Sequence, residues 1–131
     1  MKDTLKTPGV PAVLTLAVVL LAAACGGGGG AEAPAAAETA ARAEGHELFK
    51  QTCAVCHGQG GEGIPALGKN LNANEFVNAS TDAQLVEFLE LGRPATHPDN
   101  TRGVDMPPKG GNPTLTDEDL AKIVKYLRSL Q

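Results

Sequence analysis

Apolar residues recur at helical spacing near the end of the chain, where Leu120, Ile123, Val124 and Leu127 fall on one face. Thr116 stands just before this stretch as a candidate N-cap. Acidic residues follow in the positively charged first turn and basic residues in later turns: Asp117, Glu118, Asp119, Lys122, Lys125 and Arg128. The pattern predicts an amphipathic helix that begins at Thr116 and covers a core.

Two further helices are predicted upstream. One begins at Ser80 or Thr81, because Thr81 and Gln84 have the spacing of a capping box, and it ends at Gly92. The other runs from about Glu44 to the first of a pair of cysteines. Apolar and polar residues do not alternate with period two over any useful length, so no sheet is predicted. The expected fold class is all-α, with three main helices.

The first 24 residues have the composition of a secretory signal. Lys2 and Lys6 form a short positive region, and the apolar run that follows is too short for a comfortable membrane span of about 20 residues. Small residues then lead to Cys25, as in bacterial lipoprotein signals. This arrangement predicts cleavage before Cys25 and lipidation of its thiol, with cleavage nearby without lipid or a retained anchor as the alternatives.

Cys25 and residues 26–44 are predicted to form a lipidated tether. Gly26–Gly30 is expected to be a flexible coil, and the alanine-rich remainder, which can be helical near the domain, has no large side chain whose burial would offset the entropy of ordering. Residues 45–131 then form one domain with no tryptophan, three phenylalanines and one tyrosine. A core this small would be completed by an enclosed apolar cofactor.

Charge argues against one class of partner. The chain has 11 Lys and Arg against 15 Asp and Glu, a net charge of −4, and the domain has 8 against 11, a net charge of −3. A surplus of negative charge gives no support for nucleic-acid binding. No nucleic-acid partner is therefore expected.

The segment Cys53-Ala54-Val55-Cys56-His57 is a c-type haem attachment motif. Each thiol can form a thioether with a haem vinyl group, and the adjacent histidine then lies beneath the iron. A zinc ribbon would need a second pair of ligands, which the chain lacks. A metal knuckle, a redox dithiol and a structural disulfide are the alternatives. One covalent haem c is expected, and with Cys25 in lipid no cysteine remains for a disulfide.

A sixth iron ligand can be sought among the methionines and histidines. Met1 leaves with the signal, so Met106 is the one thioether available, in a loop rich in proline and glycine. An open sixth position or His97 are the alternatives, and His46 is expected at the surface of the first helix. The predicted axial pair is His57 and Met106.

The order of these motifs resembles class I cytochrome c over essentially the whole C-terminal domain. Gly45 and Phe49 match the glycine and the aromatic residue of that family's first helix, which crosses the last helix, and Tyr126 matches the aromatic partner there. Pro65 matches the loop proline whose carbonyl accepts a hydrogen bond from the haem histidine, which orients the ring. Met106, with a proline after it, matches the distal-ligand loop.

The resemblance implies outer-sphere transfer of single electrons by a carrier rather than catalysis at the iron. Within the class, the Met106 loop is similar to that of monohaem lipoprotein cytochromes of bacterial respiratory chains, such as the monohaem subunit of alternative complex III or oxidase-associated cytochromes c. The implied location is the outer, periplasmic face of the cytoplasmic membrane, with a respiratory complex or terminal oxidase as partner. Arg93, Arg102 and Asn100 are candidates to bind the haem propionates.

Two other functions compete with this interpretation. The domain can instead be the cytochrome subunit of a periplasmic oxidoreductase, such as a thiosulfate-oxidising complex. A haem-based ligand sensor would require Met106 to be displaceable. Co-purification from membranes separates the first two functions, and carbon monoxide binding tests the third.

Overall fold

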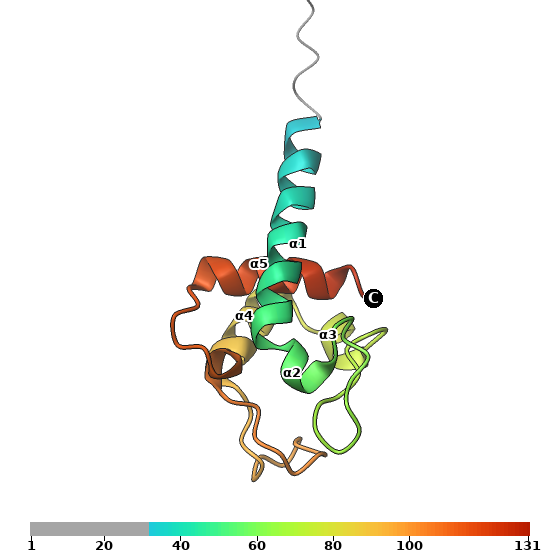
Figure 1. The fold of residues 1–131 in the computed structure, drawn as a ribbon, viewed down its shortest axis with the longest axis vertical. Coiled ribbons are helices and arrows are strands. Elements are labelled where there is room, and N and C mark those ends of the chain that lie inside the picture. The colour runs from blue at the N-terminus through green and yellow to red at the C-terminus, as the bar shows by residue number, and fades with distance from the viewer. Residues whose placement is uncertain (1–31) are drawn as a thin grey trace, which may run out of the picture.

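The computed structural model describes residues 32–131, so the predicted signal segment, Cys25 and the glycine run lie outside the described residues. The elements are α1 (Glu32–Thr52), α2 (Ala54–His57), α3 (Glu75–Ala79), α4 (Asp82–Leu91), the 3-10 segment η1 (Pro108–Gly111) and α5 (Asp117–Arg128) (Figure 1). Within this part of the chain, extended pairing is limited to two isolated bridges. The all-α prediction with three main helices is confirmed.

The helix α1 begins well before the predicted start and includes most of the expected tether. Alanine has the highest helix propensity, and residues 33–43 are rich in it. Ion pairs join the helix to α5, from Glu38 to Lys125 at 3.4 Å and from Glu44 to Lys122 at 2.9 Å. The alanine-rich segment that the sequence allowed to be helical near the domain is therefore helical from Glu32 onwards. The first turns of α1 extend beyond the rest of the domain (Figure 1).

The crossing of α1 over α5 confirms the expected use of a glycine. A Cβ atom at Gly45 would lie 1.9 Å from the backbone oxygen of Lys122, so only glycine allows this approach. One turn later, Phe49 packs on Tyr126 with ring centroids 5.1 Å apart. His46 also stacks on Tyr126, at 4.5 Å, and is half-buried rather than a free surface residue. The prediction for His46 was wrong because Tyr126 reaches across to this face of α1.

The helices α4 and α5 begin as their sequences predict. Thr81 accepts a hydrogen bond from the Gln84 N–H while the Gln84 side chain accepts from the Thr81 N–H, which completes a capping box. Thr116 and Asp119 form the same reciprocal pair at the start of α5. Gly92 ends α4 in a positive-φ conformation, at +67°. The local sequence therefore determines these helix ends.

The short helix α3 was not predicted, and a distant arginine holds it in place. Its N-cap is Asn74, whose side chain accepts from the Val77 N–H. From α5, Arg128 donates to the backbone oxygens of Val77 and Ser80 and pairs with Asp82 at 2.8 Å. A helix of five residues gains little from local propensity, so these tertiary contacts decide its position.

The core lies where α1, α4 and α5 meet. The largest fully buried side chains are Phe49, Leu85, Leu120, Ile123 and Val124. Four of them also line a cavity that opens beside this core. None of the helices in residues 32–131 is long and apolar enough to cross a lipid bilayer.

Candidate functional site

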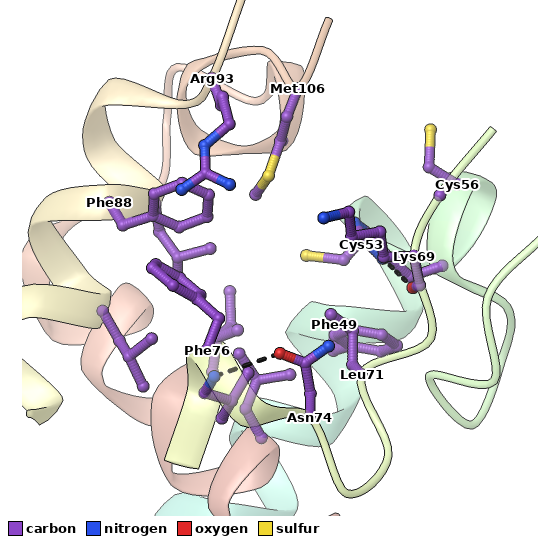
Figure 2. A pocket seen from close by; sticks show the side chains of 18 of the residues that line it. Phe49, Cys53, Cys56, Lys69, Leu71, Asn74, Phe76, Phe88, Arg93 and Met106 are labelled. Carbon is purple, nitrogen blue, oxygen red and sulfur yellow. Dashed lines mark hydrogen bonds between the residues drawn. The ribbon is translucent and has the colours of Figure 1, made fainter. Parts of the chain in front are cut away.

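The cavity has a volume of about 560 Å³. That size falls within the range of roughly 300–1,000 Å³ typical of ligand and cofactor sites. Its walls are mainly apolar and come from α1, α3, α4, α5 and the loops between them. Figure 2 shows Phe76 and Phe88 on one side and the two cysteines on the other. The structure thus has a large apolar cavity beside the small core, where an apolar cofactor was expected to complete it.

The proximal wall comes from the end of α1 and from α2. The Cys53 N–H donates to Phe49 O at 2.8 Å, and the His57 N–H donates to Cys53 O at 3.0 Å, so the motif forms a tight helical turn. Nδ1 of His57 lies 2.8 Å from Lys69 O. Because a carbonyl can only accept, Nδ1 carries the proton and Nε2 keeps its lone pair for a metal. This bond fixes both the tautomer and the ring orientation.

The acceptor for His57 was predicted to be Pro65, and that prediction is wrong. Pro65 is exposed and does not line the cavity. Gly68 packs so tightly against the motif that a Cβ atom there would lie 2.1 Å from Cys56 O. This close approach carries the next residue, Lys69, under the histidine ring. In the sequence, the residue that indicates the acceptor for His57 is therefore Gly68 and not Pro65.

The two thiols of the motif are free. Burial raises the pKa of the Cys53 thiol to about 11, and the neighbouring Cys56 adds to the effect. A redox dithiol requires the opposite shift, towards a thiolate at neutral pH. Within the described residues, no group of three His, Cys, Asp or Glu side chains could hold a metal ion. Both observations disfavour the dithiol and metal-knuckle alternatives.

The distal wall carries Met106. Its backbone N–H and C=O pair with those of Arg93, at 2.9 and 2.8 Å, in one of the two isolated bridges. Gly92 allows this contact, since a Cβ atom there would lie 2.2 Å from Met106 O. Figure 2 shows the Met106 side chain pointing into the cavity. The long loop after α4 thus returns to the end of the same helix and presents a thioether sulfur.

Asn100 organises this loop by five hydrogen bonds. Its amide N–H₂ group donates to the backbone oxygens of Arg93, Pro94 and Val104, at 3.4, 3.1 and 2.7 Å. Its Oδ1 accepts from the N–H groups of Arg102 and Gly103, at 3.1 and 3.0 Å. The Asn100 side chain therefore connects the start of the loop, at Arg93 and Pro94, to Val104, which lies two residues before Met106. Sequence reasoning identified Asn100 only as a candidate propionate ligand.

The alternative ligand His97 lies outside the cavity. It is exposed, and its Nδ1 accepts a hydrogen bond from the Asp99 N–H at 3.1 Å. Arg93 and Arg102 both line the cavity, but Arg102 is exposed whereas Arg93 is half-buried. The Arg93 guanidinium stacks on Phe76 and Phe88, 5.1 and 4.7 Å from the ring centroids. Sequence reasoning did not identify these two aromatic residues as part of the site.

The donor set and the walls fit a covalently held haem. The His57 imidazole with its free Nε2 and the Met106 thioether are ligands suited to haem iron, and the two thiols of the tight turn are placed to form thioethers with the vinyl groups. The apolar walls suit the porphyrin faces. Cys53, Cys56, His57 and Met106 all contribute to the lining of the same cavity.

Comparison with known proteins gives the same result. A model of the cytochrome c family matches residues 42–131. The FixP subunit of a cbb3-type cytochrome c oxidase from Bradyrhizobium diazoefficiens is 31% identical over 90 residues, which are 69% of this chain and 30% of that protein. The CcoP subunit from Rhodobacter capsulatus is 26% identical over 87 residues, 66% of this chain and 28% of that protein. This chain thus spans less than a third of the length of these oxidase subunits.

A smaller relative is covered almost completely. Cytochrome c-555 of Chlorobaculum thiosulfatiphilum is 28% identical over 85 residues, which are 65% of this chain and 91% of that protein. No solved structure shows significant similarity to the chain. The family model covers more than half of the chain and includes every residue of the cavity described above. The chain belongs to the cytochrome c family, and its domain is an electron carrier with covalently bound haem c.

Proposed function

We propose that this protein is a membrane-tethered monohaem cytochrome c that transfers single electrons in a bacterial respiratory chain. Cys53 and Cys56 would form the thioethers with the haem, and His57 and Met106 would bind its iron. One observation carries the assignment: the histidine with a free Nε2 and the methionine side chain occupy walls of one apolar cavity beside the two thiols (Figure 2). The haem supplies a one-electron Fe(III)/Fe(II) couple.

The residues around the site favour rapid electron transfer with little rearrangement. The Lys69 carbonyl holds the His57 ring, and the Arg93 backbone holds Met106, so both ligands are fixed before the iron changes charge. A thioether ligand and a low-dielectric pocket both stabilise ferrous iron, which raises the potential. Two protein ligands leave no open position for oxygen or substrate. The domain relays electrons and does no chemistry at the metal.

The proposed location is the periplasmic face of the cytoplasmic membrane, with lipid on Cys25 as the anchor. The signal-like composition of residues 1–24 and the small residues before Cys25 support this location. The proposed partner is a respiratory complex or terminal oxidase, supported by the relatives that are subunits of cbb3-type oxidases.

Attachment of the haem is tested on the mature protein. Acid acetone should leave the haem on the wild type, and Cys53→Ala with Cys56→Ala should abolish covalent attachment. The ferric wild type should show the weak long-wavelength band of a methionine–iron bond. Extraction of haem from the wild type would refute the proposal.

The anchor and the partner need a separate experiment. Cys25→Ser should move the protein from the membrane to the soluble periplasmic fraction, or leave it unprocessed, with the haem spectrum unchanged. Proteins that co-purify with the detergent-solubilised wild type then identify the partner. A terminal oxidase supports the respiratory role, whereas a thiosulfate-oxidising enzyme supports the competing one.

A further inference from the structure

The cation at the far side of the cavity, Arg93, has no counter-ion within residues 32–131. Arg93 is half-buried, lines the cavity, and forms none of the ion pairs among the residues that the structure describes. Its side-chain contacts are the faces of Phe76 and Phe88 and one long hydrogen bond, from Nη1 to Asp99 O at 3.4 Å. A partly buried guanidinium with so few polar partners is costly unless an anion joins it.

The haem supplies such an anion on the appropriate side. Its two carboxylates are on the pyrrole rings opposite those that carry the vinyl groups. Figure 2 shows the cysteines that would hold the vinyl carbons on one side of the cavity and Arg93 on the other. The carboxylates of the haem would therefore extend towards the wall that carries Arg93. A guanidinium can donate two parallel hydrogen bonds to one carboxylate.

The other polar groups near the cavity are less suited to this role. The Asn100 amide already makes five hydrogen bonds within its own loop. The Lys109 ammonium donates to Leu115 O at 2.7 Å. Arg102 is exposed, and Lys69 lies on the cysteine side of the cavity (Figure 2). Of the three residues that the sequence suggested as propionate ligands, Arg93 is therefore the best suited.

We propose that Arg93 binds a haem propionate and thereby raises the redox potential of the iron. The inference rests on the proposed function, since it requires a haem held by the two cysteines. Ferric haem carries one more positive charge than ferrous haem, so a cation beside the propionate destabilises the ferric state. The guanidinium also neutralises a carboxylate that would otherwise stabilise that state. Arg93 is a positioning residue here, because it touches the cofactor but not the iron.

The test measures the midpoint potential of the holoprotein at one pH and one salt concentration, together with the ferric methionine–iron band. Arg93→Gln should lower the potential and keep the band. Arg93→Lys retains the charge and should recover part of the loss. The matched control is Arg42→Gln, which removes the same charge from an exposed position on α1 and should leave the potential almost unchanged.

Three results would overturn the proposal. Arg93→Gln could leave the potential at the value of the Arg42→Gln control. Arg93→Lys could lower it as far as Arg93→Gln does, so that charge is irrelevant. Loss of the methionine band in Arg93→Gln would show that Arg93 acts by holding Met106 instead. A wild-type protein without covalent haem or without that band would refute the proposed function itself, which is a different outcome.

Discussion

At the scale of single residues, the site needs two kinds of group: side chains that are proposed to bind the iron, and backbone groups that hold those side chains in place. His57 and Met106 are the proposed iron ligands, while Lys69 and Arg93 act on them through backbone groups. A change at Lys69 that keeps the backbone in place should therefore affect the histidine less than a change at Gly68, which creates the close approach. The His57 ring thus requires the Lys69 backbone oxygen in its position, but it does not require the Lys69 side chain.

Replacement of Met106 tests the distal ligand. Met106→His should keep the iron six-coordinate, remove the long-wavelength band and lower the potential, because imidazole stabilises ferric iron better than a thioether does. Axial ligands set haem potentials over a range of as much as about 0.8 V, so the shift should be large. Met106→Ala should instead open a position that binds carbon monoxide in the ferrous protein. Rapid carbon monoxide binding by the wild type would contradict the assignment and favour a sensor.

Replacement of Gly45 tests the crossing of α1 and α5. Gly45→Ala places a methyl group against the Lys122 backbone, which cannot move without separating the helices. We expect a loss of about 2–4 kcal/mol in the free energy of unfolding, measured by denaturant titration. Gly60→Ala is the control, because its Cβ atom would meet only the Glu62 side chain, at 3.4 Å. Equal stability of the two variants would contradict the close packing.

At the scale of elements, two side chains with several hydrogen bonds hold the loop that carries Met106 and the short helix α3. Asn100 closes the loop that carries Met106, and Arg128 connects α5 to α3 and to the start of α4. Both side chains satisfy several backbone carbonyls at once. Loss of either leaves buried or half-buried acceptors without partners, which costs about 1–3 kcal/mol for each group.

A variant that keeps the acceptor of the Asn100 amide and removes its donors tests how this side chain holds the loop. Asn100→Asp keeps the acceptor for Arg102 and Gly103 but loses the donors to Pro94 and Val104, and its negative charge faces carbonyl oxygens. We expect weaker Met106 ligation, seen as partial loss of the methionine band and faster carbon monoxide binding. Asn112→Asp is a control, since the Asn112 side chain uses only Oδ1, as an acceptor from Thr114. An intact band in Asn100→Asp would show that the donors are dispensable.

The ion pair between Asp82 and Arg128 gives a pH-dependent contribution to stability. A hydrogen bond from Arg128 holds the pKa of Asp82 below its usual value, and Lys125 adds to the effect. A lowered folded-state pKa stabilises the protein above the unfolded pKa of about 3.9. The contribution is lost as the pH falls through the folded pKa. Asp82→Asn should cost about 0.5–1 kcal/mol at pH 7, since the pair is half-exposed, and the difference should vanish in acid.

At the scale of the whole molecule, the length of α1 sets the distance between the cysteine motif and the first described residue. The helix has 21 residues, so its ends are about 30 Å apart at 1.5 Å per residue. The cysteine motif follows its last residue, and the segment towards Cys25 precedes its first. Phe49 and Thr52, in the last turn of α1, line the cavity, which therefore lies at the C-terminal end of this helix.

The haem should also complete the core. The walls of the cavity, whose volume is about 560 Å³, are mainly apolar and contact water when no haem fills it. The double variant Cys53→Ala with Cys56→Ala should therefore lose near-ultraviolet circular dichroism and cooperative unfolding when haem is absent. A haem-free variant that unfolds cooperatively at the temperature of the holoprotein would contradict this role.

The sequence by itself determined the elements whose signals are local. The caps at Thr81 and Thr116, the end of α4 at Gly92 and the apolar face of α5 follow from neighbouring residues. The CxxCH motif is equally local, because the thioethers and the histidine must come from one turn. These features need no knowledge of distant segments, which explains why they were predicted correctly.

Only the tertiary structure decided which distant groups complete the site. The acceptor for His57 is Lys69 rather than Pro65 because Gly68 packs on the Cys56 backbone, a contact that no spacing rule contains. Likewise, Arg93 reaches the cavity because its backbone pairs with Met106, thirteen residues further along the chain. Ion pairs from Glu38 and Glu44 also connect the alanine-rich part of α1 to α5, which the sequence did not predict. Sequence specifies local geometry, and packing selects the partners that surround the haem.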